Sequence, residues 1–349
     1  MNAPRSMNAC IVALGARTAV GLRAGPSAAA VRAGLTRLAE HPSMVDRTGD
    51  PFRVCMDSTL DAVGRLRRMQ ALAISALEEV LEPMPVTPEQ TVPILLGVPE
   101  PSDIPPVMID RMTAGVAAAL SPRCRAHIVP VREGNASVIV ALERALAGIA
   151  DRTIECCIVG GVDSWIDADV LEALDADKRV LSVSNRWGVP PGEGAAMLAV
   201  CSHAFARQSG LRPRAWIAAA VTTMEANLAR TDSVCTGEGL GQAFTQAAAR
   251  AGASVTKQYC DLDGDRYREH EFSFAILRAP PAAFVNAVDY VAPADCWGSV
   301  GAATGAMLAT LPVLHHERGF SPGPWPMVWC GSDNGRRGAL VLHLEPRPG

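Results

Sequence analysis

The chain has 349 residues, of which 49% are hydrophobic and 19% are charged. This composition excludes a disordered, collagen-like or coiled-coil protein and predicts a compact globular chain with roughly two domains' worth of residues. The chain contains 32 Lys and Arg residues and 36 Asp and Glu residues, so the formal net charge is −4. Because no overall positive field exists to hold a polyanion, we expect no nucleic-acid partner.

The first apolar run covers residues 9–16 and is followed by Arg17. It is too short to cross a bilayer, which takes about 20 residues, and it lacks a clear signal-peptide cleavage site. We interpret the run as the first strand of a sheet. The sequence therefore predicts a cytoplasmic protein with no membrane attachment.

Short β-rich runs alternate with Ala- and Leu-rich helical patterns along the chain. The elements predicted first are a strand at 9–14, helices at 27–40 and 67–81, a strand at 91–97, a helix at 135–149 and a strand at 154–159. Asn135 is a competent N-cap for its helix. This alternation predicts an α/β fold in which helices cover sheets.

The later elements repeat the same kinds of unit. They are a helix-prone stretch at 166–179, a turn at 190–194 before a strand at 195–201, a strand ending at 260, a helix at 298–311, and a turn at 331–338 before a strand at 339–344. A loop followed by a helix occurs at 134–135 and again at 298–299. We interpret this as an internal duplication, with an N-terminal half at 1–206 and a C-terminal half at 207–349 that form one intertwined unit.

Ten Cys residues are scattered and lie mostly in apolar runs, a pattern typical of buried, reduced thiols. No CxxC pair and no His/Cys cluster has metal-ligand spacing, so we expect no metal. The neighbours Cys156 and Cys157 lie in a predicted strand, where consecutive side chains point to opposite faces. We therefore expect no redox role for this pair.

Five short motifs follow one another along most of the chain: LGARTAVG at 14–21, IVGGVDS at 158–164, PPGEGA at 190–195, GSVGAATG at 298–305 and GSDN at 331–334. Together they resemble the β-ketoacyl-(acyl carrier protein) synthases of the thiolase superfamily, in the order of that family. The match at 190–195 is the most specific. The resemblance implies an α/β, thiolase-like, five-layered α-β-α-β-α fold with two similar halves, and a dimer.

The resemblance also implies where the family's catalytic cysteine and two histidines would lie. These positions hold Asn135, Asp261 and Ser299. An amide cannot carry an acyl group as a thioester, although the family needs a thiolate at this helix start. A carboxylate at Asp261 opposes a developing oxyanion, which the family's histidines stabilise. We therefore expect no standard condensation at these three positions.

Five further residues are candidates for the pocket. Gly331 and Asn334 belong to the last glycine-rich loop, and Ser137 lies two residues into the helix after Asn135, with no evident triad partner. A different register at 261–271 (DLDGDRYREHE) would bring Cys260 or His270 toward the pocket. This polar stretch is either a solvated, salt-bridged loop or a pocket rim that offers acid–base groups.

Three functions are open at this point, none with a cofactor. The first is a chain-length-factor-like partner of an active synthase in fatty acid or polyketide-type metabolism, which contacts an acyl carrier protein and forms a homo- or heterodimer. The second is an acyl-thioester transferase or hydrolase that uses Asp261, His270 or Ser137. The third is a non-enzymatic scaffold protein.

Two arginine clusters bear on the carrier-protein contact, because carrier proteins are acidic. One opens the helix predicted at 67–81, with Arg65, Arg67 and Arg68. The other, with Arg123 and Arg125, precedes a predicted strand. Either cluster is a docking patch or an ordinary solvated surface.

Overall fold

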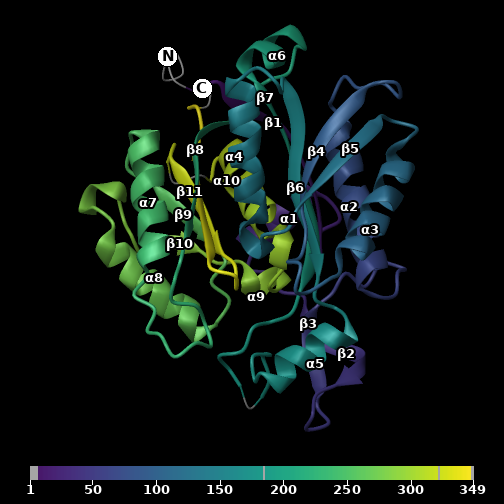
Figure 1. The fold of residues 1–349 in the computed structure, drawn as a ribbon, viewed down its shortest axis with the longest axis vertical. Helices are drawn as coiled ribbons and strands as arrows, with labels where there is room; N and C mark the ends of the chain where they lie inside the picture. Colours follow the sequence, from purple (N-terminus) through teal and green to yellow (C-terminus); the bar gives the residue numbers. More distant parts are fainter. Residues whose placement is uncertain (1–6, 184, 321–322, 347–349) are drawn as a thin grey trace.

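The computed structural model describes residues 7–183, 185–320 and 323–346 (Figure 1). Ten strands form two sets of five that meet where β1 pairs with β8 at Cys10–Trp216 and Ile11–Ala215. The first set is β1 (Ala9–Thr18), β4 (Thr91–Gly97), β5 (Arg125–Val131), β6 (Cys156–Ser164) and β7 (Glu193–Ser202). The second set is β8 (Ala215–Met224), β9 (Lys257–Cys260), β10 (Tyr290–Val291), β11 (Pro326–Gly331) and β12 (Arg336–His343).

The two sets have the same topology. Their orders are β5-β4-β6-β7-β1 and β10-β9-β11-β12-β8, so the third strand along the chain is outermost in each. The inner strand β4 is parallel to its neighbours β5 and β6, and β9 is parallel to β10 and β11. In contrast, β7 and β12 are antiparallel to both neighbours. The two halves are therefore similar, as the motifs implied.

Helices form three layers around the two sheets (Figure 1). In the centre lie α4 (Ser137–Ala150) and α10 (Thr304–Glu317), with α1 (Ala24–Arg32) beside α10. One outer layer contains α2 (Arg65–Leu81) and α3 (Pro106–Leu120), and the other contains α7 (Glu238–Ala251) and α8 (Arg266–Arg278). Every residue of α10 from 304 to 315 is buried, since this helix is covered on all sides. The arrangement is the five-layered α-β-α-β-α fold.

The remaining elements lie outside these layers or in the connections. They are the hairpin of β2 (Leu38–Val45) and β3 (Pro51–Cys55), the helices α5 (Ala168–Ala176), α6 (His203–Gln208) and α9 (Ala294–Trp297), and 3-10 turns at Gly134–Ala136, Pro281–Ala283 and Gly301–Ala303. The boundary expected between residues 206 and 207 falls within α6 and stays a prediction. Within the described residues, no helix combines the length and the apolar character that a membrane crossing requires.

Two predicted boundaries and one loop differ from the structure. The helix expected at 27–40 ends at Arg32, because Gly34 adopts a left-handed conformation with φ 66° that terminates it. The helix expected from 298 begins only at Thr304, after a 3-10 turn. The polar stretch 261–271 is a loop only up to Asp265, whose carboxylate accepts the N–H of Tyr267 at 2.8 Å and caps α8.

A close approach between the halves explains Gly161, the second of the paired glycines at the centre of β6. A Cβ atom on Gly161 would lie 2.1 Å from the carbonyl oxygen of Ala302, in the 3-10 turn before α10. That distance is far shorter than van der Waals contact. The glycine therefore lets the C-terminal half pack directly on β6, beside the start of α4.

Glu193, in the motif at 190–195, forms a buried ion pair with Arg68. Its carboxylate accepts hydrogen bonds from Arg68 Nε at 2.7 Å, from Ser164 Oγ at 2.8 Å and from the N–H of Asp57 at 2.9 Å. The side chains of Arg68 and Glu193 are 8% and 0% exposed. These bonds tie α2, β6 and the segment after β3 to the first residue of β7.

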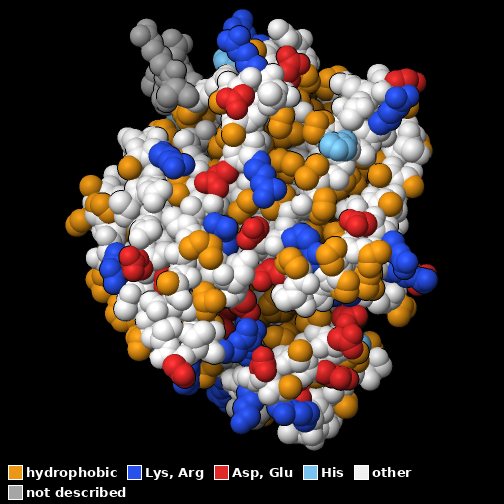
Figure 2. All heavy atoms as spheres, viewed as in Figure 1, with side chains coloured by type: hydrophobic (Ala, Val, Ile, Leu, Met, Phe, Trp, Pro, Cys, Tyr) orange, Lys and Arg blue, Asp and Glu red, His pale blue; other side chains and the backbone are white. Residues whose placement is uncertain are grey.

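Charged side chains of both signs are interspersed over the face of the molecule in Figure 2. Neither sign forms a continuous field on that face, in keeping with the net charge of −4. This distribution gives a polyanion no extended surface to bind there.

We predict that Glu193→Ala lowers the free energy of unfolding by about 3–5 kcal/mol, since it leaves the Arg68 guanidinium buried without its partner. Urea unfolding measures this loss. Arg47→Ala is the control, because the Arg47–Asp175 pair includes an arginine that is 59% exposed and should change stability by less than about 1 kcal/mol. Equal effects of the two substitutions would contradict the role given to Glu193.

Candidate functional site

Asn135 lies in the 3-10 turn Gly134–Ala136 that leads into α4. Its Nδ2 atom donates a hydrogen bond to Oδ2 of Asp261 at 3.0 Å. Asp261 directly follows β9, so this bond connects the start of the central helix in the first half with a loop of the second half. The backbone carbonyl of Asn135 accepts a hydrogen bond from Cys330 Sγ at 3.2 Å.

The carboxylate of Asp261 is held by a cation and a backbone amide. Its Oδ2 atom accepts from Arg268 Nη1 at 3.0 Å and from the N–H of Gly331 at 3.0 Å, in addition to Asn135. The side chain is 6% exposed, and its other oxygen, Oδ1, accepts no hydrogen bond from the described residues. Asp261 therefore serves as a charged anchor that orients the amide of Asn135.

Ser299 has a different acidic partner. Its Oγ donates to Oδ2 of Asp263 at 2.7 Å. Burial raises the pKa of Asp263, while the Arg268 charge and the bond from Ser299 oppose that rise. Sequence analysis missed Asp263, although it is the second carboxylate of the DLDGD run and could have been singled out there.

One small cavity brings the three predicted positions together. Asn135, Asp261 and Ser299 line it with Cys260, as do Asp263, Pro293, Ala294, Trp297, Gly298, Val300, Thr304 and Leu308. Its volume is about 20 Å³, and a single water molecule needs about 10–15 Å³ by this kind of measure. The cavity thus has room for one water and none for an acyl chain.

The thiols next to this cavity are poor nucleophiles. Burial raises the pKa of Cys260 well above its ordinary value, and burial does the same for Cys330. Cys260 donates to the carbonyl of Val291 at 3.7 Å. Both sulfurs are therefore protonated near neutral pH and do not replace the thiolate that Asn135 lacks.

The other predicted pocket residues support loops or lie apart. Ser137 is fully buried, and its Oγ accepts the N–H of Glu133 at 2.9 Å. Asn334 Nδ2 donates to the Glu133 carboxylate at 3.1 Å, and Gly331 contributes its backbone N–H to Asp261. His270 is exposed on α8 and does not line the cavity.

Glu100 is a titratable group beside this site that sequence analysis missed. It follows β4, and a Cβ atom on Gly134 would lie 2.5 Å from its Oε1. Burial, together with the nearby carboxylates of Asp103 and Asp333, raises the pKa of Glu100 to about 7. An acidic residue just past the carboxyl end of a buried parallel strand is the signal that could have identified it.

A second cavity is a surface cleft of about 780 Å³. It lies between the N-terminal end of α2, the segment before α3, and α5. Its lining mixes apolar and charged side chains, including Ile104, Met108, Trp165, Arg179, Arg230 and Asp333. Asn135, Asp261 and Ser299 are not among the lining residues. Asp333 connects the cleft with the site around Asn135. Its carboxylate pairs with Arg179 at the cleft and with Arg268, which holds Asp261.

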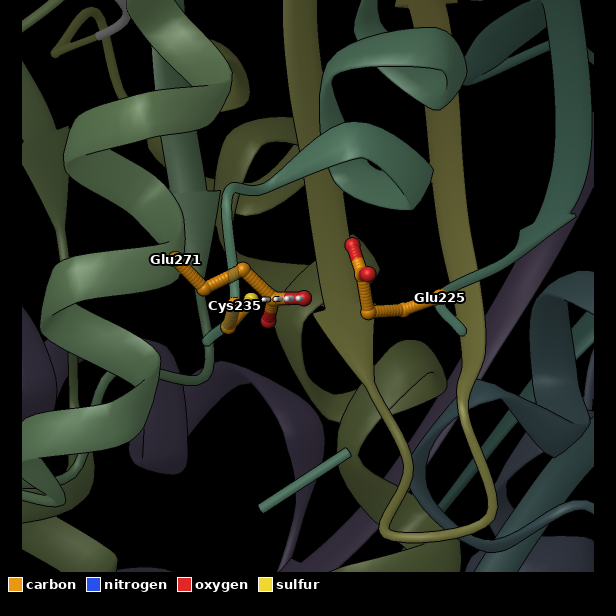
Figure 3. A group of neighbouring side chains, drawn as sticks. All are labelled: Glu225, Cys235 and Glu271. Atoms are coloured by element: carbon orange, nitrogen blue, oxygen red, sulfur yellow. Dashed lines mark hydrogen bonds between the residues drawn. The ribbon is translucent and has the colours of Figure 1, made fainter. Parts of the chain in front are cut away.

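Glu225, Cys235 and Glu271 point toward one another and carry potential metal-ligand atoms that lie within 4.8 Å of one another (Figure 3). Their oxygens already have internal partners. Glu271 pairs with Arg337 at 2.6 Å, and Glu225 accepts the N–H of Gly239 at 2.9 Å. We assign no metal to this cluster, because the arginine already neutralises one of its two carboxylates.

Comparisons with solved structures identify the fold. An acyl carrier protein in complex with its ketosynthase, from a type II polyketide synthase, matches with a TM-score of 0.80 and 14% identity over 97% of this chain and 100% of that chain. The ishigamide ketosynthase/chain length factor matches with a TM-score of 0.79 and 16% identity over the same shares of the two chains. A β-ketoacyl synthase from Burkholderia phymatum matches with a TM-score of 0.74 and 16% identity, again over 97% of this chain and 100% of that chain.

This chain has the thiolase-like fold of ketosynthases and chain length factors. The resemblance inferred from the five motifs is thereby confirmed for the fold. No protein-family model matches the sequence, and no curated protein does. At 14–16% identity the ketosynthase-like fold is established, whereas the activity has to be argued from the site itself.

We predict that Glu100→Gln flattens the pH dependence of stability. The ordinary pKa of a glutamate is 4.5, and the pKa of Glu100 in the folded chain is about 7. The folded state therefore binds this proton more tightly than the unfolded state does, so the free energy of unfolding falls as the pH rises between these values. Glu100→Gln lacks this contribution and should lose less stability across the same window.

Urea unfolding at about pH 5 and about pH 7.5 tests this expectation. Glu89→Gln is the matched control, because Glu89 is exposed and precedes β4, whereas Glu100 follows that strand. An identical pH dependence in the wild type and in Glu100→Gln would show that Glu100 titrates normally.

Proposed function

We propose that this chain is a non-condensing, ketosynthase-like subunit that pairs with an active ketosynthase in a fatty acid or polyketide-type pathway and influences the product as a chain length factor does. One observation carries the proposal. At the start of α4, where the resemblance expects a thiolate, Asn135 presents an amide that is bound to the carboxylate of Asp261 at 3.0 Å.

The chemistry of these groups supports the proposal. The nitrogen lone pair of an amide is delocalised, so Asn135 does not attack a thioester. A negative charge on Asp261 would also raise the energy of a thiolate or an oxyanion formed beside it. Cys260 and Cys330 are held as neutral thiols, so neither is suited to accept an acyl group.

The small size of the cavity points the same way. A volume of about 20 Å³ leaves no space for a growing acyl chain beside Asn135. A subunit with this interior would influence chain length from its interface with an active partner, rather than by holding the chain itself.

An exposed sheet edge supports pairing with a second subunit of this fold. β5 is the outermost strand of the first set, so one row of its backbone groups has no strand beside it among the residues that the structure describes. Five of its seven residues are buried or partly buried, which leaves an apolar edge that a partner strand would cover. One solved neighbour pairs a ketosynthase with a chain length factor, and another pairs an acyl carrier protein with a ketosynthase, which favours partners of these classes.

The first arginine cluster gives less support to carrier-protein docking on this chain, whereas Arg123 and Arg125 of the second are both exposed. Arg65 pairs with Asp163 at 3.0 Å, and Arg68 is buried against Glu193. Only Arg67 of the first cluster is exposed. We therefore propose that the active partner provides most of the contact with an acidic carrier protein.

Acyl transfer or hydrolysis by this chain has weaker support. Ser137 is buried and accepts a backbone hydrogen bond, Asp261 is tied to Arg268, and His270 lies outside the cavity. A scaffold role without acyl chemistry is separated from the proposal by the partner, because a scaffold would not associate with a ketosynthase.

We predict that the wild-type chain forms no covalent adduct with an acyl-carrier thioester, because its site lacks a thiolate. Intact-mass spectrometry after incubation with malonyl- and hexanoyl-carrier thioesters measures this. An active ketosynthase treated in parallel is the positive control. An acyl adduct on the wild type that disappears in Asn135→Ala would contradict the proposal and favour catalysis by this chain.

We predict that Val129→Arg roughly halves the particle mass that light scattering measures for this chain mixed with its ketosynthase partner, because a charged side chain on β5 prevents the edge from pairing with a partner strand. Val288→Arg is the control, since Val288 is 64% exposed and lies away from β5. The β5 interface is wrong if Val129→Arg keeps the mass of the wild type.

A further inference from the structure

Three cysteines that lie far apart in the sequence form a row across three neighbouring strands. In the strand register, Cys10 of β1 is directly opposite Cys201 of β7, and Cys156 of β6 is opposite Cys201 on the other side. Side chains of directly opposed residues share one face of a sheet. The sulfur atoms of Cys10 and Cys201 lie 3.9 Å apart, with Cys201 as the middle member.

The row differs in exposure along its length. Cys10 and Cys201 are fully buried in the outer apolar core under α2, whereas Cys156 is partly exposed. A reagent in solvent therefore meets Cys156 first. Cys157, the next residue of β6, packs on the opposite face in the central core, so it is separate from the row.

The middle sulfur has the environment of a nucleophile. Hydrogen bonding with the neighbouring thiols of Cys10 and Cys156 lowers the pKa of Cys201, as does the charge of His203, while burial opposes the lowering. The pKa values of Cys10 and Cys156 are raised in turn, by these hydrogen bonds and by burial. Cys201 is therefore the member of the row that most readily carries the thiolate.

We propose that Cys156, Cys201 and Cys10 form an oxidation site for hydroperoxides, in which a disulfide forms between Cys156 and Cys201 and then moves to Cys201 and Cys10. The peroxide oxidises the Cys156 thiol to a sulfenic acid and is itself reduced to an alcohol or water. The Cys201 thiolate attacks the Cys156 sulfur and expels hydroxide, which takes up a proton to form water. Overall, two thiols and one hydroperoxide give one disulfide, one alcohol or water, and one further water.

The second step moves the disulfide inward without a net redox change. The Cys10 thiol gives up its proton as it attacks the sulfur of Cys201, and Cys156 leaves and takes up a proton. Displacement at a disulfide sulfur needs the attacking and leaving sulfurs on opposite sides of the central one. The row meets this need, because β7 lies between β1 and β6 and Cys201 stands between the other two cysteines.

Strand geometry permits both disulfides. Directly opposed residues of antiparallel strands have Cα atoms about 4.5–5.5 Å apart, which is inside the range of about 4.4–6.8 Å found for disulfides. The sulfurs of Cys10 and Cys201 have to approach from 3.9 Å to about 2.05 Å, a change that side-chain rotation can supply.

The test is a time course with hydrogen peroxide on the native, reduced full chain. Samples are alkylated, digested and mapped by mass spectrometry. We expect linked peptides that join Cys156 to Cys201 at early times and Cys10 to Cys201 later, and loss of both on treatment with dithiothreitol. Disulfides among other cysteines, or a Cys156 sulfinic acid with no link to Cys201, would overturn the proposal.

Three variants sharpen this test. Cys201→Ala should lose both linked peptides and leave Cys156 as the oxidised thiol. Cys156→Ala should lose the early link and slow the formation of the Cys10–Cys201 link, since the peroxide then has no partly exposed thiol in the row. Cys157→Ala is the matched control and should behave as the wild type. Formation of the Cys10–Cys201 link at the wild-type rate in Cys156→Ala would contradict the order of steps. The wild-type peptide map decides the proposal even if a core variant fails to fold.

Discussion

The hydrogen bond between the amide of Asn135 and the carboxylate of Asp261 is the interaction on which this account depends. It joins the start of α4, in the N-terminal half, to the loop after β9 in the C-terminal half. The carboxylate is in turn held by Arg268 and by the backbone of Gly331. Because each group has a fixed partner, the helix start is a structural junction between the halves, and the cavity beside it is nearly filled.

Two buried ion pairs join the sheets to the outer helices, and one of them lies at the candidate site. Glu193 and Arg68 bind the first sheet to α2, while Asp261 and Arg268 bind the second sheet to α8. Each pair is joined by direct hydrogen bonds, which offset part of the desolvation cost of its charges. A thiolate or an oxyanion formed at this helix start would lie near the Asp261 carboxylate, which would raise its energy.

The alternation of helices and strands was predictable from periodicity within short segments, and the five-layered fold was predictable from the motifs that carry the family resemblance. The strand at Thr91–Gly97 and the end of α2 at Leu81 lie where the sequence predicts them, and Gly161 is required by a close backbone approach. The gathering of Asn135, Asp261 and Ser299 followed from the resemblance. The bond from Ser299 to Asp263 and the row of Cys10, Cys156 and Cys201 were not predictable, since they depend on loop conformation and on the register of strands far apart in the sequence.

A crystal structure of this chain after incubation with an excess of a long-chain acyl pantetheine thioester tests the central claim most directly. We expect the Asn135 amide to remain about 3.0 Å from the Asp261 carboxylate, with no acyl density beside Asn135, Cys260 or Ser299. An acyl group bonded to the protein there, or an acyl chain in an enlarged cavity next to Asn135, would contradict the claim that this half-to-half junction has replaced a condensing site.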